Sequence, residues 1–317
     1  MTITESVAEP VRLPAPSSAS APLAGADAAA PAAWRDYVTL TKPRIMSLLV
    51  LTAVCAMVAA AGGHPDVLAL LALTVGGGLA CGASGTLNHV LDRDIDRVMG
   101  PRTANRPVAA RRISPRRAVL FGALLAVLSF LIMSVFTNLL AAVLALAGGI
   151  YYVLVYTVWL KRNTSQNIVI GGAAGAMPAL SGWAAAHGQL GLGAWLLFTI
   201  VLVWTPPHFW ALALLLKRQY KAADVPMLPV VKGSRATVRQ VLLYTVLLLG
   251  VSLIPVATGT FGLLYAGAAV ILGGVFLWLA GRLWRRGTAA AAGVVFHYSL
   301  LYLALLFVAV AVDATVR

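Results

Sequence analysis

Acidic side chains, and charged residues in general, are scarce in this chain. Asp and Glu together account for ten of its 317 residues, and only 11% of the sequence is charged while 60% is hydrophobic. With a mean hydropathy of +0.88, so little charge cannot cover the surface of a water-soluble domain of this size. The composition excludes an ordinary soluble protein and predicts a membrane protein.

Cysteine is nearly absent as well. The two cysteines, Cys55 and Cys81, fall within long apolar stretches and do not have the spacing of metal ligands. We therefore expect no disulfide framework, and we expect both thiols to pack as small apolar side chains.

The apolar residues are gathered into stretches long enough to cross a bilayer, which takes about 20 residues per helix. An all-α membrane protein with about nine transmembrane helices is the expected fold. The stretches lie approximately at 46–62, 68–91, 117–136, 138–160, 167–187, 191–216, 240–258, 261–281 and 295–313.

Basic residues are distributed unevenly among the segments between these stretches. Of the 24 Lys and Arg residues, all but Arg317 precede the first stretch or follow the second, fourth, sixth or eighth. By the positive-inside rule this predicts a plasma-membrane protein with a cytoplasmic N-terminus and an outside C-terminus. The net charge of +14 then belongs to cytoplasmic loops that face acidic lipid headgroups, and not to a surface for nucleic acid.

Residues 1–34 differ in composition from the rest of the chain, because they are rich in Ala, Pro and Ser and include Glu5, Glu9 and Asp27. This is typical of a disordered tail. The segment lacks the positive start and apolar core of a signal peptide. Residues 35–317 are left for a single transmembrane domain.

The segment NHVLDRDIDRVMG ends the second apolar stretch and places Asn88, Asp92 and Asp96 at every fourth position. Side chains with this spacing share one face of a helix. A carboxamide and two carboxylates there offer the oxygen ligands that a hard divalent cation such as Mg²⁺ prefers. The Arg-rich run PRTANRPVAARRISPRR follows directly, so the pattern predicts a site for a metal and a diphosphate.

A fourth acid, Asp94, lies roughly 200° round the helix from Asp92 and should point away from this face, toward a neighbouring Arg. The simpler alternative for the whole motif is a solvated helix end, at which Asp92 and Asp96 pair with Arg93 and Arg97.

The longer segment NHVLDRDIDRVMGPRTANRP resembles the first Asp-rich motif of the UbiA superfamily of intramembrane prenyltransferases. Further segments resemble one branch of it, the protoheme IX farnesyltransferases or heme O synthases. These are YVTLTKPRIMSLLV, KRNTSQNIVIGGAAGAMPALSGWAA, WTPPHFWALALLLKRQYKAADVPMLPVVKG and FHYSLLYLALLF. Together they cover most of the chain after residue 35.

The resemblance implies a Mg²⁺-dependent enzyme whose helices surround a central cavity capped by cytoplasmic loops. Its reaction would join farnesyl diphosphate to a vinyl group of heme B with addition of water, giving heme O and diphosphate. A downstream heme A synthase is the implied partner enzyme. By residue type and resemblance, Asn88, Asp92 and Asp96 would hold Mg²⁺, and the candidate diphosphate contacts are Lys42, Arg44, Arg102, Arg106, Lys161, Tyr220 and Lys221.

The second Asp-rich motif departs from the family pattern. The superfamily places two carboxylates there, whereas this chain has Tyr220 and Asp224, and it has Gln219 where the branch tends to carry Asp. Asp224 is thus the one additional candidate ligand for Mg²⁺, and the alternative is that Tyr220 and Lys221 contact the diphosphate instead.

For the heme acceptor, His208 is the first candidate contact and His297 the second. His208 follows Pro206 and Pro207, which should break or kink the sixth helix and free backbone groups near the cavity. Trp183 could offer its π face to the cationic reaction intermediate. The alternatives are a hydrogen-bonded core histidine and a tryptophan that anchors the membrane interface.

Two other functions remain open from the sequence. One is a UbiA-type prenyltransferase that acts on another aromatic or tetrapyrrole acceptor, against which the segments PPHFWAL and VPMLPVVKG argue. The other is an ion-coupled transporter. The acids lie at one membrane face and no inverted repeat is visible, which disfavours a transporter.

Overall fold

A computed structural model describes residues 33–317, which form helices joined by short loops and contain no β-strand. The predicted tail at 1–34 lies outside the described residues except for Ala33 and Trp34. In chain order the helices are α1 (Trp34–Leu40), α2 (Pro43–Ala60), α3 (Val67–Leu91), α4 (Arg93–Met99), α5 (Pro101–Ala104), α6 (Pro115–Phe136), α7 (Leu139–Ile150), η1 (Tyr151–Leu160), α8 (Lys161–Asn163), α9 (Asn167–His187), α10 (Leu192–Leu215), α11 (Lys217–Ala222), α12 (Leu228–Val231), α13 (Gly233–Ala257), α14 (Leu263–Arg286) and α15 (Ala289–Val316).

Within residues 33–317, nine helices are long and apolar enough to cross a membrane, which confirms the predicted fold class. They are α2, α3, α6, the continuous run Leu139–Asn163, α9, α10, α13, α14 and α15. Three of them extend at least five residues beyond the predicted apolar stretches: α13 begins at Gly233, α14 continues to Arg286 and α15 begins at Ala289. The extra turns of α13 and α14 carry arginines, whose long side chains can reach the interface. The extra turns of α15 have the uncharged sequence AAAAGV, and the Thr288 hydroxyl caps them by accepting from Ala291 N at 3.2 Å.

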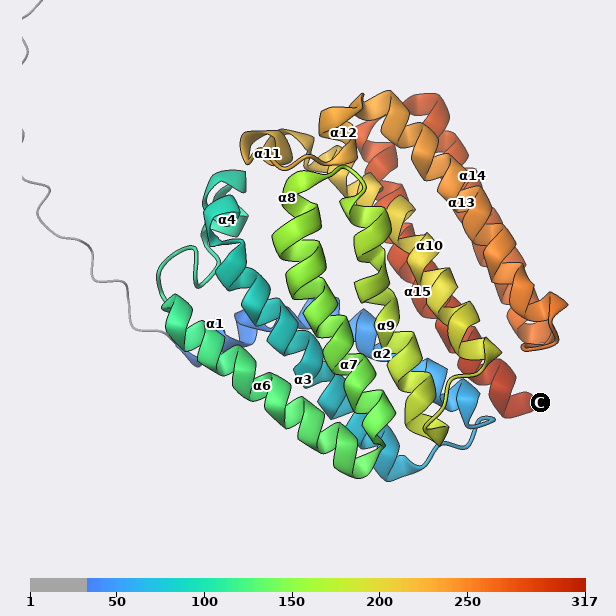
Figure 1. The fold of residues 1–317 in the computed structure, drawn as a ribbon. Coiled ribbons are helices and arrows are strands. Elements are labelled where there is room, and N and C mark those ends of the chain that lie inside the picture. The colour runs from blue at the N-terminus through green and yellow to red at the C-terminus, as the bar shows by residue number, and fades with distance from the viewer. Residues whose placement is uncertain (1–32) are drawn as a thin grey trace, which may run out of the picture. The chain divides into compact units, whose positions relative to one another are not determined.

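The spanning helices pack in an order that brings distant segments together (Figure 1). α2 lies against α3, α9 and α15, while α10 packs on α9, α13 and α15. α6 covers α3, and α14 packs against α13 and α15. The contact of α2 with α9 is very close, because a Cβ at Gly182 would collide with the carbonyl oxygen of Ala53. Gly85 on α3 is similarly close, with its would-be Cβ 3.2 Å from the Leu40 carbonyl oxygen.

Short helices gather at one end of these spans: α4, α8, α11 and α12 lie together at the top of Figure 1. α4 and α11 are in contact although they follow different spanning helices. The sequence predicted helical register as far as Asp96 and a basic loop beyond it. Gly100, at φ 146°, instead separates the two short helices α4 and α5 there.

The sixth spanning helix is not interrupted at its prolines. α10 runs unbroken from Leu192 to Leu215 with Pro206 and Pro207 inside it, so the expected break is absent. The prolines remove two backbone donors, and the neighbouring Thr205 hydroxyl donates to the Val201 carbonyl oxygen at 2.8 Å. α10 packs on four other spanning helices, α2, α9, α13 and α15, and this packing keeps it helical despite the prolines.

At the opposite end of the spans, a buried acid joins α15 to α14. Asp313, 1% exposed, accepts hydrogen bonds from the backbone N–H groups of Gly262 at 2.6 Å and Tyr265 at 3.2 Å. These groups begin α14 and have no partner within that helix, so Asp313 satisfies them from a neighbouring helix.

Candidate metal and diphosphate site

The predicted acid motif lies where α3 ends and α4 begins. Asp92 separates the two helices, with φ −89° and ψ 4°. The backbone bonds nevertheless keep the four-residue period, because Asp92 N donates to Asn88 O at 2.9 Å and Asp96 N donates to Asp92 O at 2.8 Å. The three side chains are buried, at 3% exposure or less. The interrupted helix thus still directs them to one side.

Side chains from two other segments complete the polar cluster around Asn88. Lys42, which precedes α2, donates from Nζ to Asn88 Oδ1 at 2.5 Å. Asn88 Nδ2 donates to Asp92 Oδ2 at 2.8 Å and to Thr157 Oγ1 at 3.1 Å. Lys161 Nζ forms a buried ion pair with the same Asp92 oxygen at 2.5 Å. Three separate parts of the chain therefore hold one carboxamide and one carboxylate in place.

The backbone at Lys42 is itself strained, with φ 55° and ψ 56° directly before Pro43. A left-handed conformation at a residue with a side chain costs about 1–3 kcal/mol and persists where the surroundings impose it. The hydrogen bond to Asn88 is one contact that imposes it here.

Asp96 is held by a second base and leaves an oxygen free. Arg106 Nη1 pairs with Asp96 Oδ1 at 2.6 Å. The other oxygens, Asp96 Oδ2 and Asp92 Oδ1, are buried and accept no hydrogen bond from residues 33–317. Burial raises the pKa of Asp96 above its usual value. Burial also lowers the pKa of Lys42 to about 7, with the charges of Arg106 and Lys161 acting in the same direction.

The remaining acid of the motif behaves as predicted. Asp94 is 59% exposed and receives two hydrogen bonds from Arg162, at 2.8 and 2.9 Å. These bonds hold the pKa of Asp94 well below its ordinary value. The alternative of a solvated helix end is not what the structure contains, because Arg93 and Arg97 donate to backbone carbonyl groups instead of to the buried carboxylates.

The other predicted diphosphate contacts divide into buried and exposed groups. Tyr220, on α11, is 9% exposed, and burial raises the pKa of its hydroxyl to about 12. The neighbouring Gln219 approaches Gly100, where α11 meets α4. The other three predicted diphosphate contacts, Arg44, Arg102 and Lys221, are exposed and make no side-chain hydrogen bond with the described part of the chain. The same holds for Asp224, the additional candidate ligand for Mg²⁺.

Two buried polar residues near this end were not predicted from the sequence. Thr157 lies in the π-helical segment η1, and its hydroxyl donates to the Tyr152 carbonyl oxygen at 2.9 Å while it accepts from Asn88. Asn167 begins α9, is fully buried, and neither of its amide atoms is hydrogen-bonded within residues 33–317. A π-helix has no hydropathy pattern of its own, although such segments recur at functional sites.

The cluster suits a hard cation. No group of three His, Cys, Asp or Glu side chains that could hold a metal occurs among residues 33–317. Mg²⁺, however, is commonly held by one or two carboxylates together with substrate phosphates. The unpaired buried oxygens of Asp92 and Asp96 fit that requirement.

The first predicted heme contact lies in an aromatic cluster inside the spans. His208 is buried and stacks on Trp204, with ring centroids 4.4 Å apart, and on Phe296 at 4.9 Å. Its Nδ1 lies 2.7 Å from Ser299 Oγ, whose proton is donated to the Phe296 carbonyl oxygen at 2.6 Å. Nδ1 of His208 is therefore the donor, and the neutral ring keeps the lone pair on Nε2.

His297 lies at the edge of this cluster, with its ring centroid 5.1 Å from that of Phe296, whereas Trp183 lies elsewhere. His297 is exposed, and its Nδ1 donates to the Gly293 carbonyl oxygen at 2.8 Å. Trp183 lies near the opposite end of α9, where its ring fills the space beside Gly193 at the start of α10.

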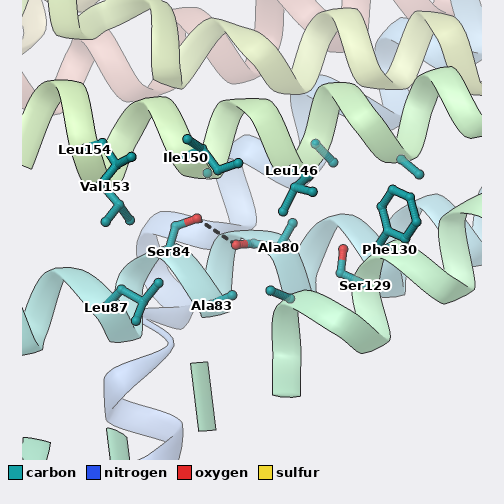
Figure 2. A pocket seen from close by; sticks show the side chains of 14 residues that line it. Ala80, Ala83, Ser84, Leu87, Ser129, Phe130, Leu146, Ile150, Val153 and Leu154 are labelled. Carbon is teal, nitrogen blue, oxygen red and sulfur yellow. Dashed lines mark hydrogen bonds between the residues drawn. The ribbon is translucent and has the colours of Figure 1, made fainter. Parts of the chain in front are cut away.

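A hollow of about 230 Å³ opens between α3, α6 and the α7–η1 run (Figure 2). Its lining is almost entirely apolar, and both of its hydroxyl groups donate hydrogen bonds to backbone carbonyl oxygens. Ser84 Oγ donates to the Ala80 carbonyl oxygen at 2.9 Å, as Figure 2 shows, and Ser129 Oγ donates to the Gly76 carbonyl oxygen at 2.6 Å. No charged side chain lines it, so this hollow is distinct from the acid cluster.

Similar proteins share both sequence and fold with this chain. The UbiA prenyltransferase family model matches residues 49–311. A protoheme IX farnesyltransferase of Thermus thermophilus is 52% identical over 285 residues, which cover 90% of this chain but 47% of the relative. One of Gloeobacter violaceus is 49% identical over 287 residues, covering 89% of this chain and 93% of the relative. The chain thus spans about half the length of the Thermus relative.

Solved structures with little sequence identity have the same fold. A structure of digeranylgeranylglyceryl phosphate synthase has a TM-score of 0.73 at 19% identity, covering 89% of this chain and 99% of that one. A UbiA homologue from Archaeoglobus fulgidus, bound to GPP and Mg²⁺, has a TM-score of 0.62 at 15% identity, covering 87% and 99%.

The described helices and the buried acid–base cluster define a multi-pass, all-helical membrane protein with a polar site at one end of its spans. The chain belongs to the UbiA prenyltransferase family, and the resemblance found in its motifs is thereby confirmed.

Proposed function

We propose that the domain at residues 35–317 transfers a farnesyl group from farnesyl diphosphate to a vinyl group of heme B, with addition of water, giving heme O and diphosphate. The single observation that carries the proposal is the pair of buried carboxylates, Asp92 and Asp96. Each has one cationic partner and one oxygen that accepts no hydrogen bond from residues 33–317. Identities of 49–52% to protoheme IX farnesyltransferases support the choice of substrates.

The diphosphate would bind at the end of α3. Lys42, Lys161 and Arg106 reach the cluster from three segments and bring positive charge to it. An arginine matches phosphate oxygens with its planar fork, and the two amines act as compact charges. The exposed bases Arg44, Arg102 and Lys221 are proposed to guide the substrate from the cytoplasmic side and do not form the inner site.

Mg²⁺ would be held by Asp92 Oδ1 and Asp96 Oδ2 and, after Lys42 has moved to the diphosphate, by Asn88 Oδ1. The ion supplies positive charge that stabilises the departing diphosphate oxygens. This metal dependence is supported by the Mg²⁺ and GPP bound to the Archaeoglobus fulgidus homologue. Asp224 follows α11 and is exposed, so we do not include it among the ligands of this first ion.

The chemistry requires charge stabilisation and exclusion of water more than a protein nucleophile. The bond between C1 of the farnesyl group and the diphosphate oxygen breaks, and the electron pair leaves with the diphosphate. The vinyl π electrons of heme B then form the new bond to C1. Water captures the resulting cation beside the macrocycle and releases a proton. Lys42, Arg106 and Lys161 would stabilise the leaving group.

The heme would lie deeper in the membrane than the diphosphate. His208 lies about two helical turns before α10 ends, among the rings of Trp204, Phe209 and Phe296. Its available Nε2 suits an axial contact with heme iron. We place His297 outside this contact because its ring is exposed and its Nδ1 is bonded to the Gly293 carbonyl oxygen, although it packs on Phe296. Trp183 is left out because it lies beside Gly193, at the opposite end of α9.

The topology follows from the basic loops. We propose a plasma-membrane protein with the cytoplasm on the side of α4, α8, α11 and α12, a cytoplasmic N-terminus and an outside C-terminus. The product would pass to a heme A synthase as the downstream partner.

The test is mass spectrometry of hemes extracted after the purified protein has been incubated with heme B, farnesyl diphosphate and Mg²⁺. We expect a hydroxyethylfarnesyl heme that is lost with EDTA and in Asp92→Ala. Asp94→Ala is the matched control, because it removes an exposed acid two positions away and should keep nearly full turnover. Equal turnover in both variants would contradict the assignment of the site.

The acceptor is tested separately from the diphosphate chemistry. Unchanged heme B together with Mg²⁺-dependent release of diphosphate in the presence of another aromatic or tetrapyrrole compound would favour the alternative acceptor. A transporter would consume no farnesyl diphosphate under any of these conditions.

A further inference from the structure

The last two turns of α14 present three arginines on one face. Arg282, Arg285 and Arg286 are spaced by three and four residues, and Trp278 lies one turn before them on the same face. The four side chains surround a hollow of about 300 Å³. Arg285 and Arg286 are exposed, and Trp278 is 55% exposed.

The charge in this hollow is not neutralised by the part of the chain that the structure describes. The guanidinium groups of Arg282, Arg285 and Arg286 make no hydrogen bond and no ion pair with any residue in 33–317. Arg106 and Arg162, by contrast, each pair with an aspartate. The favourable position of a cation at a helix C-terminus explains why basic residues are tolerated there. It does not explain three unpaired guanidinium groups around a single hollow.

The order of side chains along α14 matches the layers of a membrane surface. Apolar residues of the span come first, then Trp278, then the arginines, and the helix ends at Gly287 with φ 61°. Tryptophan prefers the interface between hydrocarbon and headgroups, and arginine the headgroup layer. The guanidinium carbon of Arg282 lies 4.7 Å from the centre of the Trp278 ring, which holds that arginine at the boundary.

We propose that this hollow is a binding site for the phosphodiester headgroup of an anionic phospholipid. Arg282, Arg285 and Arg286 would donate to the phosphate oxygens, while the exposed face of Trp278 contacts the glycerol and upper acyl chain. The site is separate from the diphosphate site and does not depend on the proposed reaction.

The experiment is native mass spectrometry of the full chain in detergent, titrated with phosphatidylglycerol, with phosphatidylcholine, and with water-soluble glycerol phosphate. We expect the wild-type protein to bind one phosphatidylglycerol in preference to phosphatidylcholine and glycerol phosphate. Each arginine near an anionic surface contributes about 1 kcal/mol, or roughly five-fold in affinity. Arg282→Gln/Arg285→Gln/Arg286→Gln should therefore weaken this binding on the order of 100-fold.

The matched control is Arg111→Gln/Arg116→Gln/Arg117→Gln, which removes the same charge from exposed positions around the start of α6 and should leave the preferred lipid bound. Equal loss of lipid in the two triple variants would overturn the proposal, because the patch would then act only through net charge. Equal binding of phosphatidylcholine, or glycerol phosphate binding as tight as that of the lipid, would also overturn it. If the first triple variant does not fold, Arg285→Gln and Arg286→Gln singly should each show about a five-fold loss.

Discussion

Replacing Lys161 with methionine tests whether the acid cluster depends on its internal ion pairs. Asp92 is 1% exposed and receives one hydrogen bond from Lys161 Nζ and one from Asn88 Nδ2. Lys161→Met keeps a side chain of similar length but leaves the carboxylate buried without its positive partner. Removing one member of a buried pair typically costs about 3–5 kcal/mol.

The cost has an upper limit that depends on pH, because a buried carboxylate without a partner can take up a proton instead. Protonating an ordinary carboxyl at pH 7 costs about 4 kcal/mol, and this cost falls by about 1.4 kcal/mol for each unit that the pH is lowered. The variant then binds a proton when folded that it releases when unfolded, so its stability relative to the wild type rises as the pH falls. We expect a loss of about 4 kcal/mol at pH 7 and of about 1 kcal/mol at pH 5.

The assay is denaturant unfolding in detergent with EDTA present, followed by tryptophan fluorescence at pH 5, 6 and 7. Arg162→Met is the matched control, since it removes the neighbouring base, whose partner Asp94 is 59% exposed; the loss there should stay below about 1 kcal/mol at every pH. The double variant Asp92→Asn/Lys161→Met should recover much of the lost stability, because no ionised group is left buried. A loss that did not change with pH, or equal losses in the two single variants, would refute the reasoning.

Three other perturbations address the remaining contacts. Lys42, with a pKa near 7, is about nine-tenths neutral at pH 8 and should take up a proton when diphosphate binds. Calorimetry in buffers of different ionisation enthalpy should detect this proton uptake in the wild type and not in Lys42→Arg. Equal proton uptake in both proteins would contradict the prediction. His208→Ala should weaken heme B binding at least ten-fold in an absorbance titration while diphosphate binding stays unchanged. Ser299→Ala should weaken heme B binding less, because it removes only the hydrogen-bond partner of His208 Nδ1. Unchanged heme affinity in His208→Ala would exclude the contact between His208 and heme. Asp313→Ala removes the acceptor for the first N–H groups of α14. It should lower the free energy of unfolding by about 0.5–2 kcal/mol without affecting turnover. A loss of turnover at full stability would mean that Asp313 has another role.

Several features of the fold could be predicted because they depend on local composition. Nine apolar stretches are visible as long runs without charge, and the nine spanning helices within residues 33–317 correspond to them. The start of α13 and the end of α14 were placed several residues too far inside, because an apolar stretch ends where charge begins, whereas a helix continues while its hydrogen bonds are satisfied. The start of α15 was missed because its first turns consist mostly of alanine, which is less apolar than the residues of the predicted stretch. The unbroken α10 shows the same limit of sequence-based prediction, because packing against neighbouring helices stabilises the helix more than its two prolines destabilise it.

In the candidate site, too, the features that depend on local sequence could be predicted and those that depend on distant segments could not. The spacing of Asn88, Asp92 and Asp96 indicated a shared face, because helical periodicity is local. Which bases meet them depends on segments far apart in the chain: Lys42 and Lys161 reach the cluster, whereas Arg44 and Lys221 remain exposed. Residue type alone cannot separate the bases that reach the cluster from those that stay exposed, because a basic side chain suits phosphate equally well in either place.

By itself, the sequence determined the membrane class, the register of the acid motif and the family, since these depend on composition and on residues close together in the chain. Only the tertiary structure decided that Asp92 pairs with Lys161 and that Thr157 of a π-helical segment accepts from Asn88. It also decided that one oxygen on each of Asp92 and Asp96 accepts no hydrogen bond from the described helices and loops. The physical reason is that burial and charge pairing arise when α3, η1 and the segment before α2 pack together, and no local pattern records that packing.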